Sequence, residues 1–309
     1  MGLSTPSLVY VHFLVAMILL NVAGNSLVCL LVLKNKATKT IINWLLFHLA
    51  IADLLVAVFF IPPCVVSHFV QLPNGFLGDL LCKFVFSGNL GWVAAAASSF
   101  LLVVIAFDRY RATLHPLKTL RSRRLTRIVP VVWVLAALLL LPSIIVSAYD
   151  EERQGCVQRY PSYTLARANK IFWSTVNCVL PICMMGYLYI RIALRLRHRE
   201  LLLDSSIGAI QQSRKRVTKM LLSVSLIFTL CWTPPAALCL LVKFVPDAYT
   251  TVYFVSNVSA LLNSCINPLV YTLHSQQFRK NLASLMPCYN RKKISLSHWS
   301  PRTWNLGTN

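Results

Sequence analysis

Seven long runs of apolar residues dominate this sequence of 309 residues. A helix needs roughly 20 apolar residues to cross the ~30 Å hydrocarbon core of a bilayer, and every run reaches that length. The runs cover residues 8–33, 41–66, 84–107, 128–148, 171–194, 217–242 and 249–273. Runs this long predict helices rather than barrel strands, since a spanning segment must satisfy its own backbone groups. The expected fold is therefore an all-α bundle of seven membrane-spanning helices.

The composition agrees with a membrane location. Hydrophobic residues make up 57% of the chain and charged residues only 13%, whereas a soluble domain carries roughly 25% charged residues. The formal net charge is +21, which in a soluble protein would suggest nucleic-acid binding. Here the basic residues lie between the apolar runs, which indicates contact with anionic lipid. We therefore expect membrane lipid, and no nucleic acid, among the partners.

The distribution of basic residues predicts the orientation of the bundle. If the N-terminus is extracellular, the cytoplasmic segments hold 24 of the 30 Lys and Arg residues and the extracellular segments hold 6. Cytoplasmic segments of membrane proteins carry the excess of Lys and Arg. The C-terminus is then cytoplasmic, as an odd number of spans requires.

One acidic residue, Asp53, lies in the middle of the second run. A charge at the centre of a bilayer costs ~2.5–3.5 kcal/mol on insertion scales. The side chain is either a protonated carboxyl group that is hydrogen-bonded inside the bundle or part of a cation site. The residues alone leave both readings open.

Prolines and charged residues interrupt the later runs. Pro142, Pro181, Pro234 and Pro268 lie in the fourth to seventh runs, where each removes a backbone hydrogen bond and kinks its helix. The third run ends at Asp108-Arg109-Tyr110, a position where charges are common at the membrane interface. A bundle with so many hinges is built to move.

Seven motifs occur in order along the seven runs. They are Gly24-Asn25-x-x-Val28, Leu49-Ala50-x-x-Asp53, Asp108-Arg109-Tyr110, Trp133, Pro181 with Tyr189, Cys231-Trp232-x-Pro234, and Asn267-Pro268-x-x-Tyr271. Together they resemble the rhodopsin-like (class A) family of G-protein-coupled receptors. Within that family the motifs are most similar to those of neuropeptide receptors. The resemblance implies a plasma-membrane receptor domain at 1–288 and a cytoplasmic tail at 289–309.

The resemblance implies a set of residues that switch the receptor and couple it to a heterotrimeric G protein. Arg109 would be held by Asp108 at rest and would contact the G protein in the active state, and Trp232 would be the toggle below the ligand pocket. The full set is Asp108, Arg109, Tyr110, Tyr189, Phe228, Trp232, Asn267, Pro268 and Tyr271. The family also implies arrestin and a receptor kinase as partners.

A regulatory sodium ion beside Asp53 is also implied, and no other cofactor or metal is expected. The matching residues are Asp53, Ser98, Asn263, Ser264 and Asn267. Hard oxygen donors suit a small cation, so the resemblance favours the cation-site reading of Asp53. Ser99, one residue away, is a further oxygen whose role the sequence leaves open.

The resemblance further implies a disulfide between Cys82 and Cys156, which joins the third span to the second outer loop in an oxidising compartment. Residues 275–286 resemble an interfacial eighth helix. Cys288, just after it, is then a candidate for lipidation with palmitate.

Two of the departures from the family pattern bear directly on the third span. The distance of 27 residues from Cys82 to Arg109 exceeds the usual spacing by two, which predicts a bulge near the outer end of the third span. Arg214 stands where an acid can lock Arg109 in some members, so that lock is not expected here.

The ligand is less constrained by the sequence. No acid lies between Cys82 and Asp108 to pair with an amine, which argues against an amine receptor. The seventh run has no Lys for retinal, which excludes an opsin. The acidic cluster Asp150–Glu152 is either a rim that steers a cationic ligand or ordinary solvated surface. We expect an extracellular peptide ligand, and a small non-amine ligand of lipid or nucleoside type is the alternative. The positions expected to line its pocket are Trp92, Lys170, Trp173, Asn177, Trp232, Lys243, Tyr253 and Asn257.

A transporter and a membrane-embedded enzyme are the remaining rival functions. Transporters usually contain inverted repeats, and no internal repeat is visible in this sequence. The sequence also contains no metal triad, nucleophile–base pair or carboxylate dyad. A transporter is therefore the weaker alternative, and no enzymatic activity or catalytic residue is expected.

Overall fold

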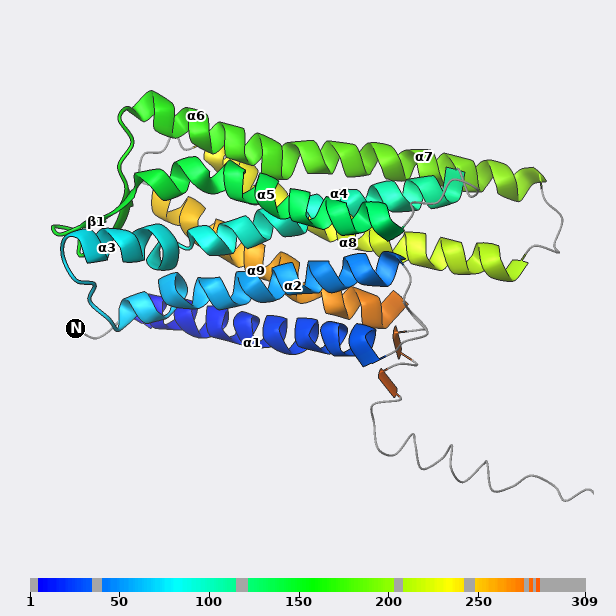
Figure 1. Ribbon diagram of the computed structural model, residues 1–309, viewed down its shortest axis with the longest axis horizontal. Coiled ribbons are helices and arrows are strands. Elements are labelled where there is room, and N and C mark those ends of the chain that lie inside the picture. The colour runs from blue at the N-terminus through cyan, green and yellow to red at the C-terminus, as the bar shows by residue number, and fades with distance from the viewer. Residues whose placement is uncertain are drawn as a thin grey trace, which may run out of the picture.

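Helices occupy all seven apolar runs in the computed structural model, which describes residues 5–34, 41–114, 122–202, 208–241, 248–274, 278–279 and 282–283. The long helices are α1 (Thr5–Lys34), α2 (Ile41–Cys64), α4 (Asn89–Leu114), α5 (Ser122–Val146), α7 (Leu180–Leu202), α8 (Gly208–Leu241) and α9 (Ala248–His274). They lie side by side along the long axis of the molecule (Figure 1). Two shorter helices, α3 (Phe76–Leu81) and α6 (Tyr163–Ser174), precede α4 and α7. The all-helical fold expected from the sequence is confirmed.

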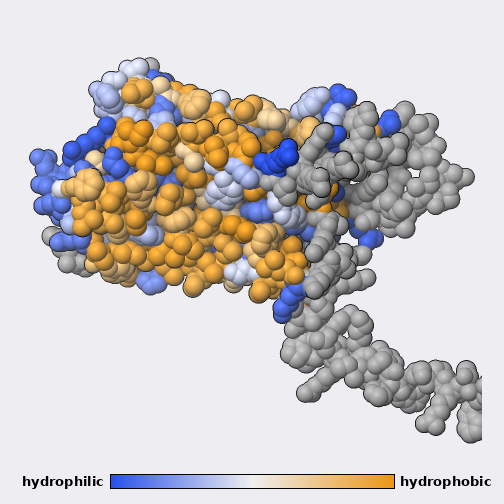
Figure 2. Space-filling view, in the orientation of Figure 1, coloured by the Kyte–Doolittle hydropathy of each residue, from blue (hydrophilic) through white to orange (hydrophobic). Residues whose placement is uncertain are grey.

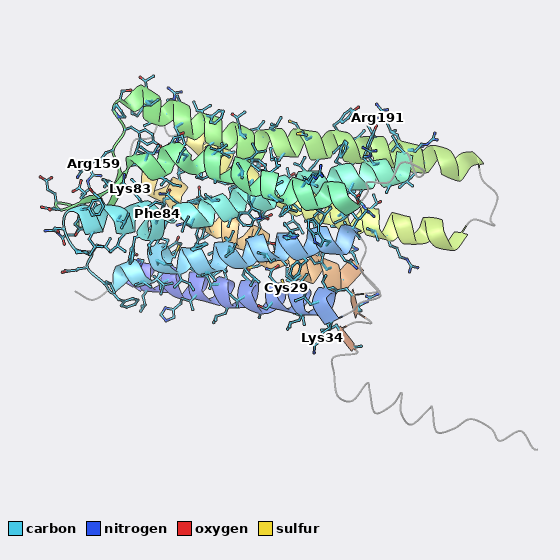
Figure 3. All side chains as sticks on the ribbon, viewed as in Figure 1. Cys29, Lys34, Lys83, Phe84, Arg159 and Arg191 are labelled. Carbon is cyan, nitrogen blue, oxygen red and sulfur yellow. A yellow bond between two sulfur atoms is a disulfide. The ribbon has the colours of Figure 1, made fainter. Side chains whose placement is uncertain are left out.

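The outward-facing side chains are apolar, as a lipid-facing surface requires. Figure 2 shows a broad hydrophobic band along the middle of the visible face, with hydrophilic residues toward its ends. In Figure 3 the charged side chains of Lys83 and Arg159 lie at one end of the bundle, and those of Lys34 and Arg191 lie toward the other. Six helical segments of the described chain are long and apolar enough to cross a membrane. The chain is therefore a multi-pass membrane protein.

α9 is not among those six segments, and it carries three asparagines along its length. Asn257, Asn263 and Asn267 lower its mean hydropathy, and all three are at most 3% exposed. Their amides therefore face the interior of the bundle rather than lipid. With 27 residues, the helix is still about 40 Å long at ~1.5 Å per residue, which is enough to span the hydrocarbon core.

α2 and α4 lie at the centre of the bundle. α2 packs against α1 and α4, and α4 also packs against α5 and α7. The middle of α4 is a row of small residues, Ala94–Ala97 followed by Ser98 and Ser99, and all of them are buried. Small side chains let neighbouring helices approach closely in a membrane, so α4 can contact helices on several sides.

The third span begins with an irregular segment where the sequence spacing predicts a bulge. α3 runs into a five-residue π turn, η3 (Cys82–Phe86), which accommodates more residues per turn than an α-helix. Gly88 then adopts a left-handed conformation with φ +70°, which glycine does at little cost, and α4 begins at Asn89. The surplus residues are therefore absorbed between Cys82 and Asn89. A second π turn, η4 (Thr175–Val179), joins α6 to α7.

A two-stranded hairpin lies at the end of the bundle where α1 begins (Figure 1). Strand β1 (Ser147–Asp150) pairs antiparallel with β2 (Gly155–Gln158), and these are the only strands in the described part of the chain. A disulfide joins Cys82 to Cys156, with their Cα atoms 5.4 Å apart. The expected pairing is confirmed, and it ties β2 to the start of the third span.

Little of the expected eighth helix lies within the described residues. Residues 278–279 and 282–283 are helical, and the ring of Phe278 packs against Tyr271 with ring centroids 6.4 Å apart. Cys288 and the tail at 289–309 lie outside the described residues. The boundary of the receptor domain, the full eighth helix and the lipidation site therefore stay predictions.

The contact of α1 with α9 depends on Gly24. A Cβ atom at Gly24 would lie 3.0 Å from Cγ and 3.1 Å from Cβ of Pro268, and a proline ring cannot rotate away. We expect Gly24→Val to lower the free energy of unfolding by about 1–3 kcal/mol, the usual cost of overpacking, measured as a lower melting temperature of the purified protein.

Gly186→Val is the matched control for this substitution. A Cβ atom at Gly186 meets nothing within 4 Å, and valine is the better helix former. Equal melting temperatures for the two variants would contradict the close packing of α1 against α9.

Candidate functional site

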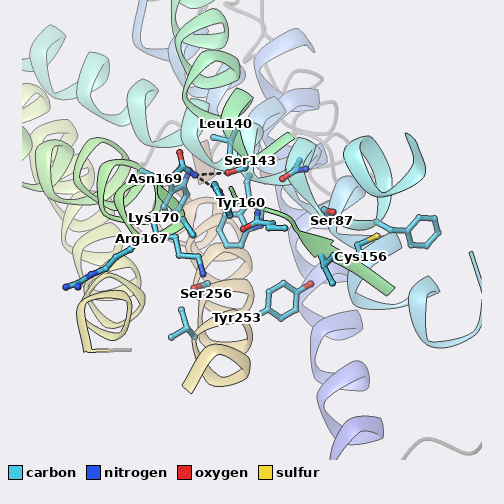
Figure 4. Close-up of a pocket in the computed structure, with 18 of the residues that line it drawn as sticks. Ser87, Leu140, Ser143, Cys156, Tyr160, Arg167, Asn169, Lys170, Tyr253 and Ser256 are labelled. Atoms are coloured by element: carbon cyan, nitrogen blue, oxygen red, sulfur yellow. Dashed lines mark hydrogen bonds between the residues drawn. The ribbon is translucent and has the colours of Figure 1, made fainter. Parts of the chain in front are cut away.

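A cavity of about 380 Å³ lies at the end of the bundle that carries the hairpin. Its wall is formed by residues of α4, α5, β2, α6 and α9, and Figure 4 shows most of these side chains. Pockets of this size bind small ligands or the end of a larger one. Cys156 lies in the wall, so the disulfide holds β2 in place beside the cavity.

The wall contains half of the residues that the sequence suggested. Trp92, Lys170, Trp173 and Tyr253 line the cavity. Three further candidates do not line the cavity but are buried in the bundle: Asn177, Trp232 and Asn257. Lys243 lies outside the described residues.

A hydrogen-bonded group that sequence reasoning missed holds one side of the wall together. The side-chain amide of Asn169 on α6 donates to Oγ of Ser143 on α5 at 3.2 Å and to the hydroxyl oxygen of Tyr160 at 2.8 Å, as the dashed lines in Figure 4 mark. These three residues connect two helices and the segment after the hairpin. Their role depends on contacts between distant parts of the chain, so the sequence offers no local signal for it.

The charges on the described wall are positive. Lys170 and Arg167 line the cavity, and no acidic residue does so within the described chain. Asp79 accepts a hydrogen bond from the backbone N–H of Tyr149 at 2.8 Å. The Asp150–Glu152 cluster lies in the hairpin, where the Asp150 carboxylate accepts from the backbone N–H of Arg153 at 3.0 Å. Asp79 and the Asp150–Glu152 cluster therefore do not belong to the described wall of the cavity.

A cluster of tryptophans separates the cavity from the interior of the bundle. Trp92 and Trp173 line the cavity, and their ring centroids lie 6.2 Å and 5.9 Å from that of Trp232. Trp232 is only 1% exposed and packs on Phe228, whose ring centroid is 6.0 Å away. A molecule in the cavity would therefore reach Trp232 through the two other indoles.

A polar network lies deeper in the bundle, around Asp53. One carboxylate oxygen accepts a hydrogen bond from Oγ of Ser98 at 2.9 Å, and the other accepts from the amide of Asn267 at 2.8 Å. The backbone carbonyl of Ser264 accepts from the amide of Asn25 on α1 at 3.1 Å. Asp53 is fully buried, so these partners replace the water that the carboxylate would otherwise bind.

The oxygen atoms of this network fit a small hard cation. Besides the Asp53 carboxylate and the Ser98 hydroxyl, the side-chain oxygens of Asn263 and Asn267 are buried and find no hydrogen-bond partner among the described residues. The Ser99 hydroxyl instead donates to the carbonyl of Ala95 on its own helix at 3.0 Å. Ser99 is therefore directed away from the network.

The opposite end of α4 carries the Asp108-Arg109-Tyr110 tripeptide. Both Nε and Nη2 of Arg109 donate to one carboxylate oxygen of Asp108. Tyr189 of α7 and Tyr271 of α9 are buried, and neither hydroxyl has a hydrogen-bond partner in the described structure. The side chain of Arg214 is not among those that the structure describes.

Residues 24–271 match the model of the family described as 7 transmembrane receptor (rhodopsin family). The chain is 29% identical to a QRFP-like peptide receptor of Branchiostoma floridae, over 98% of this chain and 82% of that protein. It is 31% identical to the neuropeptides B/W receptor type 1 of Bos taurus, over 86% and 82%. It is 30% identical to the neuromedin-U receptor 2 of Rattus norvegicus, over 84% and 71%.

The disulfide beside the cavity provides a direct test of this end of the structure. The bridge closes a loop of 74 residues, and bridges of this kind contribute ~2–5 kcal/mol. We expect Cys82→Ser and Cys156→Ser each to lower surface expression and melting temperature, and the double variant to be no worse than either, because one bond is lost in every case. Cys183→Ser, at an exposed free thiol, is the control. Additive losses would argue against the pairing.

Proposed function

This chain belongs to the rhodopsin family of seven-transmembrane receptors, and from that premise we propose that it binds an extracellular peptide and activates a heterotrimeric G protein. It is a receptor and not an enzyme. The observation that carries the peptide proposal is the cavity beside the hairpin, found in a chain whose relatives are named as receptors for peptides. A cavity of about 380 Å³ accommodates one end of a peptide, with the remainder lying over the hairpin.

The orientation in the plasma membrane follows from the charges. We propose that the cavity and the hairpin are extracellular and that Arg109 faces the cytoplasm. The excess of Lys and Arg in the connections on the Arg109 side, 24 against 6, supports this orientation. A disulfide on the cavity side is consistent with an oxidising compartment.

The proposed activation begins at the tryptophan cluster. A peptide that displaces Trp92 or Trp173 changes the packing of Trp232 and, below it, of Phe228. A close-packed core responds by moving between discrete arrangements. The kinked helices then separate at the cytoplasmic end, Arg109 leaves Asp108, and Tyr189 and Tyr271 move in to support the site at which the G protein binds. Arrestin and a receptor kinase would recognise the same active state.

We further propose that the network around Asp53 holds a sodium ion in the inactive state. The supporting observation is the set of buried oxygens described above, two of which lack hydrogen-bond partners among the described residues. A bound cation would offset the charge of the buried carboxylate. It would favour the bundle geometry in which these oxygens converge, and it would therefore oppose activation.

The test of the receptor function is ligand-induced nucleotide exchange. Membranes from cells that express this chain are exposed to a synthetic library of neuropeptides, and binding of a labelled GTP analogue to the G protein is measured. We expect at least one peptide to stimulate exchange. Stimulation by lipids or nucleosides, with none by peptides, would favour the small-ligand alternative.

Arg109→Ala should abolish stimulated nucleotide exchange, because the guanidinium of Arg109 can bind the carbonyl groups of an intracellular partner. Peptide binding should stay largely intact, because Arg109 lies at the end of α4 that is distant from the cavity. Exchange and radioligand binding are measured on the same membranes. Arg191→Ala is the control, since Arg191 is exposed on α7 and donates to the hydroxyl of Tyr187 at 3.3 Å. Full signalling by a normally expressed Arg109→Ala variant would contradict the assignment.

Sodium should raise the melting temperature of the purified receptor and weaken peptide binding, and Asp53→Asn should remove both effects. The asparagine keeps the size of the side chain but loses the charge that binds the cation. A coupling of about 1–3 kcal/mol is expected between sodium and the peptide. Sodium is compared with N-methylglucamine at matched ionic strength, and Ser99→Ala is the control because its hydroxyl faces Ala95. If the unmodified receptor has the same melting temperature and the same peptide affinity in both salts, the sodium site is contradicted and Asp53 has only a structural role.

A further inference from the structure

We propose that a groove on the outside of the bundle, between α4, α5 and α7, binds a phospholipid with an anionic headgroup. One acyl chain lies in the groove and the phosphate lies against Arg127. The groove is separate from the cavity beside the hairpin, and no step of the proposed receptor function uses it. The inference therefore goes beyond that function, and only the choice of the cytoplasmic leaflet uses the proposed orientation.

The groove exists because α5 and α7 both pack against α4, whereas contacts between α5 and α7 themselves are few. The space between them is a cavity of about 420 Å³. α4 contributes lining residues at 100–104, α5 at 127–135, and η4 with α7 at 176–184. In the third of these walls the π turn η4 runs into α7, and Pro181 follows directly. Both features disturb the regular helix, so this wall does not close on α5.

The groove opens toward lipid. Every lining residue in the described chain except Arg127 is apolar. Val131 and Leu135 of α5 are 54% and 51% exposed, and Leu180 and Met184 of α7 are 50% and 43% exposed, so the rim faces outward. The α5 part of the rim belongs to the candidate membrane span Arg127–Val146, which hydrocarbon surrounds in a bilayer. Because a site without polar partners does not hold ordered water, an acyl chain is the occupant that the surroundings supply.

The length of the groove matches one leaflet of the bilayer. Arg127 is the first residue of the candidate span, and Leu135 lies 8 residues further along α5. This separation corresponds to about 12 Å at ~1.5 Å per helical residue. One leaflet contributes about 15 Å, half of the ~30 Å hydrocarbon core. A lipid whose headgroup lies at Arg127 would therefore extend one chain along the groove almost to the midplane.

Arg127 supplies a positive charge at the end of this apolar groove. Its side chain is exposed and forms no hydrogen bond or ion pair within the described chain, and no described acid lines the groove. The sequence from Arg109 to Tyr149 contains no Asp or Glu. A guanidinium binds a phosphate through two parallel hydrogen bonds. A sterol offers no negative charge to this site, and a zwitterionic lipid brings an ammonium group close to Arg127.

The position of Arg127 also selects the leaflet. α5 runs from Ser122 to Val146, where β1 begins, so its first turns lie at the end of the bundle opposite the hairpin (Figure 1). This end is cytoplasmic in the proposed orientation. Anionic lipids are concentrated in the cytoplasmic leaflet and attract basic residues that flank a span.

The experiment uses the full chain, purified in nanodiscs of phosphatidylcholine that contain a phosphatidylserine with a diazirine in its acyl chain. After illumination, the labelled residues are mapped by mass spectrometry. We expect labelling to concentrate in residues 100–104, 127–135 and 176–184. Unlabelled phosphatidylserine should compete for this labelling, whereas equal amounts of cholesterol or further phosphatidylcholine should not.

Variants of the charge test the role of Arg127. Arg127→Gln should lower the labelling of the groove roughly fivefold, which corresponds to the contribution of one basic residue near an anionic surface. Arg127→Lys should retain most of it, because the charge is kept. Arg195→Gln is the control for the loss of one positive charge, since Arg195 is exposed on α7 and lines neither cavity.

A matched pair of substitutions tests the groove itself. Val131→Trp places a large side chain at a residue that lines the groove, and Val134→Trp places it on the same helix at a residue that does not. The two valines are 54% and 56% exposed, so they differ little in their contact with bulk lipid. We expect only Val131→Trp to reduce labelling. Melting temperatures in phosphatidylcholine show that each variant folds.

Three results would overturn the proposal. The first is labelling spread evenly over the outside of the bundle. The second is competition by cholesterol or phosphatidylcholine as strong as that by phosphatidylserine, which would indicate a sterol site or a site without charge selectivity. The third is labelling of the groove that stays unchanged in Arg127→Gln.

Discussion

A carboxyl group in the middle of a membrane has to find its hydrogen-bond partners inside the protein, because lipid provides none. Three helices converge on Asp53 for this reason: α2 carries the carboxylate, α4 supplies Ser98 and α9 supplies Asn267. The approach is possible because α4 has small residues at this level and because Gly24 leaves room for Pro268. The close packing of the centre and the polar groups within it therefore depend on each other.

Aromatic rings lie between the cavity and the interior of the bundle. Trp92 and Trp173 face the cavity and touch Trp232, which in turn packs on Phe228. Each of these contacts is weak and depends on ring geometry, so a small displacement at the cavity changes several contacts together. Such an arrangement is sensitive to the shape of whatever occupies the cavity.

The sequence predicts the features that depend on local pattern and fails for those that depend on distant contacts. The length and apolarity of a run are local, so all seven helices are found. The third and fifth begin earlier than expected, because α3 and α6 continue past the apolar runs with polar residues such as Asp79 and Arg167. Ser143 and Tyr160 were missed, because only the folded chain brings both to Asn169. Trp92 and Trp173 were predicted from their positions to line a ligand pocket, and both line the cavity. No local pattern could show that they also contact Trp232.

The disulfide also bears on how the chain is assembled. Cys156 follows Cys82 by 74 residues, and both α4 and α5 lie between them. When the chain is synthesised from its N-terminus, the second thiol arrives on the side of the first only after these two helices have crossed the membrane in opposite directions. The covalent link cannot direct their insertion, and it closes only on chains in which α4 and α5 have inserted correctly. It is therefore a chemical mark of the insertion of these two helices and not of α7, α8 and α9, which follow in the chain.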